Sequence, residues 1–331
     1  MPHRLRKEWF RTQDGNGKWQ WSRNFDCMTS TFDSISSSAA FTFIRSSSSL
    51  ESLATLQICD ANEVDASQTL TNYPINTHVL QSLVEFSAQD FSSKYAWFLK
   101  QTDTMKQSRQ IKAMLTINRD ELFQNSLLLL QDMYPEEFCS PMEMKIDGED
   151  AIDAGGVQRE WYMIFTQTLF ESDNGLFVMT SEGTQEYYFN PNSLHDFGPD
   201  HVTAFRSVGR FLARALLDGQ TIPANFCSAF YKLLLGLPMS LDDMNFFDHT
   251  VYKCMVHIRD NESIDNLALT FSVTEPSGPE IAIVDLIPGG RNIDVTNANK
   301  HIYLDYLTRH LLLQRVSVQY EHLIQGFYEV L

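Results

Sequence analysis

A cysteine and a histidine at helical spacing form the pair in this sequence that could do nucleophilic chemistry. Cys254 and His257 lie three positions apart in the stretch VYKCMVHI, so a helix would place the thiol and the imidazole on neighbouring positions. A thiol attacks acyl groups when a base activates it and a third group orients that base. No orienting group is evident from the sequence around this pair. We therefore expect no catalytic role for Cys254.

A second cluster, in the stretch DDMNFFDH, contains residue types that bind metal ions. Its carboxylates are Asp242, Asp243 and Asp248, and His249 follows directly. Their spacing matches no familiar metal site. Helix capping and solvation explain these side chains better, so we expect neither a metal ion nor another cofactor here.

The stretch GEDAIDAGGVQREW has the adjacent glycines of a phosphate-binding loop. It lacks the glycine spacing of both the mononucleotide and the dinucleotide loops. The carboxylates of Glu149, Asp150 and Asp153 would also repel a phosphate. We instead predict a structural turn, in which Gly155 and Gly156 supply positive φ and Asp153 caps the helix that follows.

Composition and charge limit the class of protein. The chain has 331 residues and a formal net charge of −17, which disfavours binding to nucleic acid or to anionic membrane surfaces. No apolar run approaches the ~20 residues that a membrane span needs. The five cysteines show neither disulfide nor zinc spacing, which favours a reducing compartment. We expect a cytoplasmic protein, with the nucleus as the alternative.

The composition divides the chain into three parts. Residues 1–28 form a basic head whose tryptophans flank an Asn-Gly turn, and this pattern predicts a β-hairpin. The head faintly resembles a WW module, but the second signature tryptophan and the closing proline are missing, which favours a disordered or partly ordered tail over a peptide-binding module. Residues 29–93 are rich in serine and threonine and read as a linker or a partly ordered segment. Residues 94–331 read as one continuous folded unit.

Hydrophobic periodicity across this unit predicts an α+β fold in which helices dominate. We expect helices over 94–107, 119–133, 157–170, 200–219, 224–236, 251–258 and from about Asn297 to the end. We expect a hairpin over 175–190 and strands over 142–148, 267–275 and 281–288.

A series of motifs in fixed order resembles the N-terminal lobe of the HECT-type ubiquitin ligase domain. The series begins with INRDELFQNSLLLL, MKIDGEDAIDAGGVQREWYMIFTQTLF, NGLF, YYFNPNS and FRSVGRFLARALLDGQTIPANFCSAFYKLLLG. It continues with LDDMNFFDHTVYKCM, LTFSV, LIPGGRNIDVTNANKHIYLDY and LIQGFYEVL. The resemblance runs from about residue 94 to the last residue. It implies a ubiquitin transferase whose large lobe docks a ubiquitin-conjugating enzyme and which acts on protein substrates.

The resemblance also implies a smaller C-terminal lobe, whose catalytic cysteine carries ubiquitin as a thioester and passes it to a substrate lysine. The sequence stops at Leu331, before that lobe. None of the five cysteines matches the catalytic position of the family: Cys27, Cys59, Cys139, Cys227 and Cys254. We therefore expect a fragment or truncated product that is inactive alone. The alternatives are a non-catalytic module that binds conjugating enzymes and, more weakly, a remnant without function.

By the resemblance, the docking groove for the conjugating enzyme maps onto Val251, Cys254, Met255, Leu267, Leu269 and Tyr303. The spacing of these residues is compatible with one continuous surface. Val251, Cys254 and Met255 would share a helix face, and Leu267 and Leu269 would share a strand face. On the residues alone such a stripe predicts buried core. The resemblance favours the groove, above all for Met255 and Leu269. We also expect the region from Val251 to Leu269 to be a small subdomain that projects from the main body.

Overall fold

A computed structural model of the chain describes residues 89–107, 112–134, 137–148, 155–180 and 185–331, together with the backbone of four short strands nearer the N-terminus. Strand β1 (Trp9–Gln13) pairs antiparallel with β2 (Trp19–Arg23), which is the hairpin predicted for the basic head. Strand β3 (Phe41–Arg45) pairs antiparallel with β4 (Leu56–Asp60). The segment predicted as a linker or partly ordered therefore holds two paired strands.

The main unit begins with a helix and a parallel strand pair. Helix α3 (Phe91–Gln107) is followed by β5 (Ala113–Ile117), α4 (Leu122–Asp132) and β6 (Met142–Ile146). Strands β5 and β6 pair in parallel, so α4 is the crossover helix between them. The prediction of β6 is confirmed, whereas β5 was missed.

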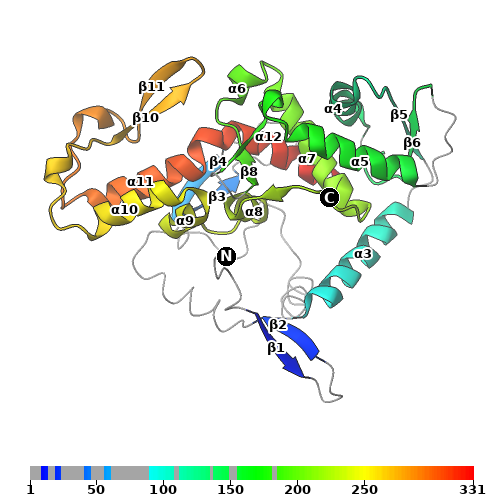
Figure 1. The fold of residues 1–331 in the computed structure, drawn as a ribbon, viewed down its shortest axis with the longest axis horizontal. Coiled ribbons are helices and arrows are strands. Elements are labelled where there is room, and N and C mark those ends of the chain that lie inside the picture. The colour runs from blue at the N-terminus through cyan, green and yellow to red at the C-terminus, as the bar shows by residue number, and fades with distance from the viewer. Residues whose placement is uncertain are drawn as a thin grey trace.

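Two closely packed helices run through the centre of the molecule (Figure 1). They are α7 (His201–Leu217) and α12 (Ser317–Val330). Glycines make the approach possible, because a Cβ at Gly326 would overlap the carbonyl oxygen of Arg206. A Cβ at Gly209 would likewise overlap the carbonyl oxygen of Leu323. Both positions therefore require glycine.

Aromatic side chains join α7 to α5 (Gly156–Leu169). The rings of Trp161 and Phe165 stack with centroids 5.9 Å apart, and Phe211 of α7 meets Phe165 edge-on at 4.7 Å. All three rings are buried. Each contributes roughly 1.5–3 kcal/mol through the apolar surface it removes from water. The core therefore lies between α5 and the central helix pair.

A small mixed sheet covers another side of α7. Strand β7 (Phe177–Met179) pairs antiparallel with β8 (Glu186–Phe189), as predicted, and β9 (Asn225–Phe226) adds to β8 in parallel. The helix predicted over 224–236 is shorter, because its first residues form β9. Helix α8 (Ser228–Leu235) begins only after the buried Cys227.

The single final helix predicted from Asn297 is two helices. Helix α11 (Lys300–Leu312) ends at Leu313, and the short turn η6 (Gln314–Val316) separates it from α12. Leu312, Leu313 and Val316 are all fully buried. The backbone of Leu313 leaves the helical conformation, with φ of −140° and ψ of −53°, and the predicted single helix breaks there.

One end of the molecule carries α9 (Met244–Phe247), α10 (His249–Asp260) and a hairpin of β10 (Ser272–Ser277) and β11 (Glu280–Asp285) (Figure 1). This is the region predicted to project from the main body. Its buried side chains, such as Ile258 and Phe271, belong to the same continuous core as those of α7 and α12. The fold is thus the predicted α+β type, mainly helical with small sheets.

The remaining short elements are α6 (Ser193–Asp196) and the turns η2 (Ser172–Asn174), η3 (Leu241–Asp243), η4 (Asp265–Leu267) and η5 (Gly290–Asn292). Among the residues that the structure describes, no helix is both long and apolar enough to cross a membrane.

Candidate docking site

Helix α10 carries half of the residues predicted for the docking groove, and a carboxylate fixes where it begins. The Asp248 side chain accepts hydrogen bonds from the backbone N–H groups of Thr250 and Val251, each at 3.0 Å. A cap of this kind stabilises a helix by about 1 kcal/mol. Asp248 thus has the capping role proposed for it.

Asp243, in the same acidic stretch, is also used structurally. It forms a capping box with Ser240, and its Oδ1 lies 2.7 Å from Nζ of Lys232. In the described part of the chain, no group of three or more His, Cys, Asp or Glu side chains could hold a metal ion.

The six predicted groove residues divide by exposure. Cys254 is exposed, as is Leu267 at 44%, whereas Val251 and Leu269 are half-buried. Met255 is only 1% exposed, so the exposure expected for it from the resemblance is wrong. The inner face of α10 packs against the core, and Met255 lies on that face together with Ile258.

Tyr303 of α11 lies beneath the same surface. It is 5% exposed, its ring meets Phe271 edge-on at 5.6 Å, and burial raises the pKa of its hydroxyl. Helices α10 and α11 are in contact along this core. Met255 and Tyr303 therefore belong to the core against which Val251 and Leu269 pack.

Leu267 and Leu269 do not lie on the predicted strand. Leu267 ends the turn η4, and Ala268 adopts the left-handed conformation with φ of 47°. Leu269 accepts a hydrogen bond through its carbonyl from Val295 N–H at 2.8 Å, and β10 begins only at Ser272. The alternation rule for strands therefore does not apply, and the two leucines differ in exposure because Ala268 redirects the chain.

We define the docking face as the outer side chains Val251, Cys254, Leu267 and Leu269. It carries no charge of its own and is mainly apolar, so it is suited to binding apolar side chains of another protein. Its one polar group is the Cys254 thiol. In the described residues no hydrogen bond joins that thiol to His257.

A third polar group near the Cys254–His257 pair was missed from the sequence. Nδ2 of Asn261 lies 3.3 Å from Nε2 of His257, one turn further along α10. The spacing i, i+4 on a helix was the available signal. Cys254 and His257 are nevertheless solvent-exposed and line no described pocket, so the arrangement lacks the dry enclosure that nucleophilic catalysis uses.

The other cysteines are placed differently. Cys227 is fully buried, and burial raises the pKa of its thiol to about 12. Cys139 is half-buried, and its Sγ donates to the carbonyl oxygen of Val330 at 3.4 Å. Cys27 lies outside the described residues, and of Cys59 only the backbone, in β4, is described.

The structural turn before α5 uses one glycine rather than two. Gly155 has φ of 90°, whereas Gly156 is the first residue of the helix and has no positive φ. Gly155 alone therefore supplies the left-handed residue. Asp153 lies outside the described residues, so its capping role stays a prediction.

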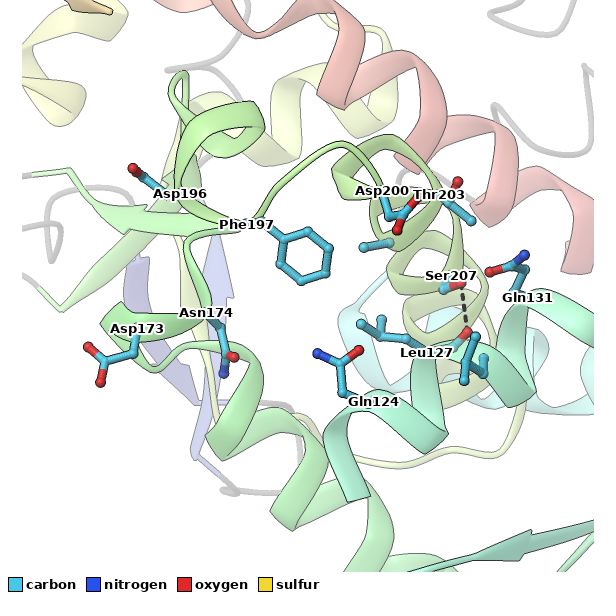
Figure 2. A pocket seen from close by; sticks show the side chains of 12 residues that line it. Gln124, Leu127, Gln131, Asp173, Asn174, Asp196, Phe197, Asp200, Thr203 and Ser207 are labelled. Carbon is cyan, nitrogen blue, oxygen red and sulfur yellow. Dashed lines mark hydrogen bonds between the residues drawn. The ribbon is translucent and has the colours of Figure 1, made fainter. Parts of the chain in front are cut away.

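A polar pocket of about 540 Å³ lies between α4, η2, α6 and the start of α7 (Figure 2). Its floor is closed by a hydrogen bond from Ser207 Oγ to the Leu127 carbonyl at 3.0 Å. It is lined by Gln124, Leu127, Leu128, Gln131, Asp173, Asn174, Asp196, Phe197, Asp200, Thr203, Ala204 and Ser207. The charged groups among these are all carboxylates. Sequence analysis missed the pocket, because its residues come from separate segments.

Comparison with known families agrees with this architecture. The family model described as HECT-domain (ubiquitin-transferase) matches residues 163–331, just over half of the chain. The chain therefore belongs to the HECT family of ubiquitin transferases, and the resemblance noted from its motifs is confirmed.

Several HECT ligases from fungi and plants are similar to this chain. It is 34% identical over 218 residues to the E3 ubiquitin-protein ligase TOM1-like of Neurospora crassa, covering 66% of this chain and 5% of that protein. It is 33% identical over 244 residues to the E3 ubiquitin-protein ligase TOM1 of Saccharomyces cerevisiae, covering 73% of this chain and 7% of that protein. It is 32% identical over 252 residues to the E3 ubiquitin-protein ligase UPL1 of Arabidopsis thaliana, again covering 73% of this chain and 7% of that protein. The chain spans less than a tenth of the length of these three relatives.

Proposed function

We propose that this chain takes part in ubiquitin transfer to protein substrates by docking a ubiquitin-conjugating enzyme on the docking face. Membership of the HECT family supports the class of reaction. The observation that carries the site is an uncharged, partly exposed set of side chains, of which Val251 and Leu269 pack against the core that contains Met255 and Tyr303.

The physical basis is burial of apolar surface on a rigid support. Leu267 is 44% exposed and therefore still has apolar area to remove from water when a partner binds. Burying a leucine side chain completely is worth roughly 1.5–3 kcal/mol, so Leu267 can supply part of that. Such contacts give most affinity when the side chains beneath them are already packed, because little conformational entropy is then lost.

We further propose that residues 1–331 do not form a ubiquitin thioester by themselves. A thiolate is the attacking species, and the Cys227 thiol has a pKa of about 12 and is enclosed in the core. The Cys139 thiol is engaged with the Val330 carbonyl. Cys254 is exposed on the docking face, and among the described residues no hydrogen bond joins its thiol to His257. In the family, as the resemblance implies, the thioester forms on a cysteine of the C-terminal lobe.

Binding to a panel of purified conjugating enzymes tests the docking proposal. Leu267→Asp should weaken binding at least ten-fold, because it places an unpaired charge in an apolar contact. Leu128→Asp is the matched control, since Leu128 is 55% exposed on α4 at the far end of the molecule. Equal binding by both variants and the wild-type chain would refute the docking face.

A non-reducing gel tests the second proposal. The chain is mixed with a conjugating enzyme charged with ubiquitin, and a band at the mass of the chain plus ubiquitin is sought. We expect none. A thiol-sensitive band that disappears in Cys254→Ala would show that this chain transfers ubiquitin through its own cysteine. Binding without such a band is also what a non-catalytic docking module would give, and joining a C-terminal lobe to the chain separates the two.

A further inference from the structure

Arg315 lies at the junction of α11 and α12, next to the start of the docking helix. Its guanidinium carbon lies 5.7 Å from the ring centre of Phe247, the residue directly before the capping Asp248. Its Nε donates to the carbonyl of Leu311 at 3.1 Å, which holds the side chain against its own turn. The positive charge is therefore fixed close to the first residues of α10.

Glu275, in the middle of β10, meets the same region from the hairpin. Nε2 of His310 lies 3.1 Å and 3.2 Å from the two carboxylate oxygens of Glu275. The hydrogen bond from His310 lowers the pKa of Glu275 against the opposing effect of burial, and the nearby charge of Arg315 lowers it further. The Glu275 carboxylate is consequently charged at neutral pH.

Glu275 and Arg315 attach to the same corner of the fold, because His310, which contacts Glu275, and Arg315 lie five residues apart at the end of α11 and in η6. Burial lowers the pKa of Arg315, and the charge of Glu275 is the largest effect that opposes this, followed by those of Tyr188 and Asp248. The charges of Glu275 on the hairpin and Asp248 at the start of α10 thus both favour the charged form of Arg315. Arg315 itself lies in η6, outside both the hairpin and α10, and its guanidinium contacts Phe247.

The hairpin has an anchored face and a free face. Glu275 is opposite Ala282, and both are half-buried, whereas Ile281 and Ile283 on the other face are 77% and 52% exposed. At the hairpin tip, a Cβ on Gly278 would lie 3.0 Å from Cγ of His195 in α6. Its anchored face and its tip therefore set the orientation of the hairpin.

The docking face is built on both sides of this junction. Val251 lies in the first turn of α10, three residues after Asp248, and Leu269 lies three residues before β10. In the docking proposed above, a partner contacts both sides at once. Their relative placement therefore decides how many contacts it can make without rearrangement.

We propose that Glu275 and Arg315 are positioning residues for docking, which hold the hairpin after Leu269 against the start of α10 without touching the partner. The inference rests on the docking function proposed above. It assigns a role in partner binding to two side chains that lie outside the docking face. Loss of either should let the two sides of the face shift relative to each other.

The test compares three chains against a conjugating enzyme that binds the wild type. Glu275→Gln should weaken binding about five-fold, in the range seen for residues that act through a packed network. Glu280→Gln, an exposed carboxylate on the same hairpin, should leave binding unchanged. Hydrogen exchange of Glu275→Gln should be faster in residues 267–285 and unchanged in α7 and α12. Exchange that is faster throughout the chain would show a general loss of stability and overturn the positioning role.

Two further variants keep the outcomes separate. Leu267→Asp reports on the docking face itself, so normal binding by that variant refutes the docking function. If Leu267→Asp loses binding while Glu275→Gln binds like the wild type, only the positioning role is refuted. Should Glu275→Gln not fold, Arg315→Lys takes its place, because it keeps the charge and loses the planar group over Phe247. It should weaken binding about three-fold, and wild-type affinity would overturn the inference.

Discussion

Nε of Arg210 in α7 lies 2.6 Å from Oε2 of Glu329, near the end of α12. Arg210 is buried, and its Nη1 also donates to the carbonyls of Leu130 and Gln131, each at 2.6 Å. Arg206 pairs with the same carboxylate from one turn earlier. Glu329 thus joins α12 to α7 through Arg206 and Arg210. Arg210 also contacts the end of α4.

Removing that carboxylate should destabilise the fold strongly. Glu329→Gln leaves the guanidinium of Arg210 buried without its counter-charge, and breaking one half of a buried ion pair costs about 3–5 kcal/mol. Urea unfolding followed by circular dichroism measures the difference. Asp260→Asn is the control, because Arg259 and Asp260 form a solvent-exposed pair whose loss should leave stability nearly unchanged. Equal losses of unfolding free energy in Glu329→Gln and Asp260→Asn would contradict the structural importance of Glu329.

The contact between α7 and α12 should depend on Gly326. In Gly326→Ala the new Cβ overlaps the backbone carbonyl of Arg206, so the two helices must separate. We expect a loss of about 1–3 kcal/mol, the usual range for overpacking a core. Gly156→Ala places its Cβ in open space at the start of α5 and should be neutral or stabilising by up to about 1 kcal/mol. Thermal unfolding of the two variants is the measurement.

Met255 and Leu267 should respond differently to the same substitution. Met255→Asp buries a charge without a partner and should lower the free energy of unfolding by several kcal/mol. Leu267→Asp changes a side chain that is 44% exposed and should change stability by less than about 1 kcal/mol. Unfolding curves of both, beside the binding data, show which residues support the docking face and which form it. A stable Met255→Asp would mean that Met255 is not part of the core.

The sequence predicts only in part which residues support the docking face and which residues form it. The apolar positions at helical spacing predicted the helix α10 itself, and the structure confirms that helix. Which of those positions face outward depends on how α11 packs, and Tyr303 is far away in the chain. The left-handed residue Ala268 carries no local signal either, since alanine rarely adopts that conformation.

The fold shows the same contrast between local and long-range information. Helix α7 was predicted well, because its apolar spacing is regular and Gly219 follows it with φ of 65°. Strand β9 has two residues and exists only through its pairing with β8, which no local pattern encodes. The break at Leu313 was missed because apolar residues continue through it at the spacing of a single helix face.

The thiols should differ in reactivity. At pH 8 an alkylating reagent should modify Cys254 within minutes, because it is exposed, and should leave Cys227 unmodified in the folded protein. The pKa of about 12 leaves Cys227 almost entirely protonated, and its burial blocks access. Peptide mass spectrometry after timed labelling measures both sites. Rapid labelling of Cys227 without denaturant would show that α8 does not enclose it.

His201 should make stability depend on pH. It is buried with Nδ1 2.9 Å from Ser193 Oγ, and burial, followed by the charge of His322, lowers its pKa from the usual 6.5. The unfolded chain therefore binds the proton more readily than the folded chain does. The stabilising contribution is complete above pH 6.5 and declines as the pH falls through the lower pKa of the folded state.

Unfolding at a series of pH values from 8 to 5 checks this expectation, with His201→Gln as the comparison. The difference in stability between the two proteins should shrink as the solution becomes more acidic. A difference that stays constant over the whole range would show that His201 titrates alike in the folded and unfolded states.

The pairing of α7 with α12 has a consequence for how the chain is made. Arg206 and Glu329 are 123 positions apart, so the central contact closes a very long loop. During synthesis the apolar face of α7 emerges more than a hundred residues before the helix that covers it. Until then this face is available to other chains and to chaperones, since long-range contacts form late and leave apolar surface exposed. Successful synthesis should therefore depend more on protection of nascent α7 than on the final stability of the folded lobe.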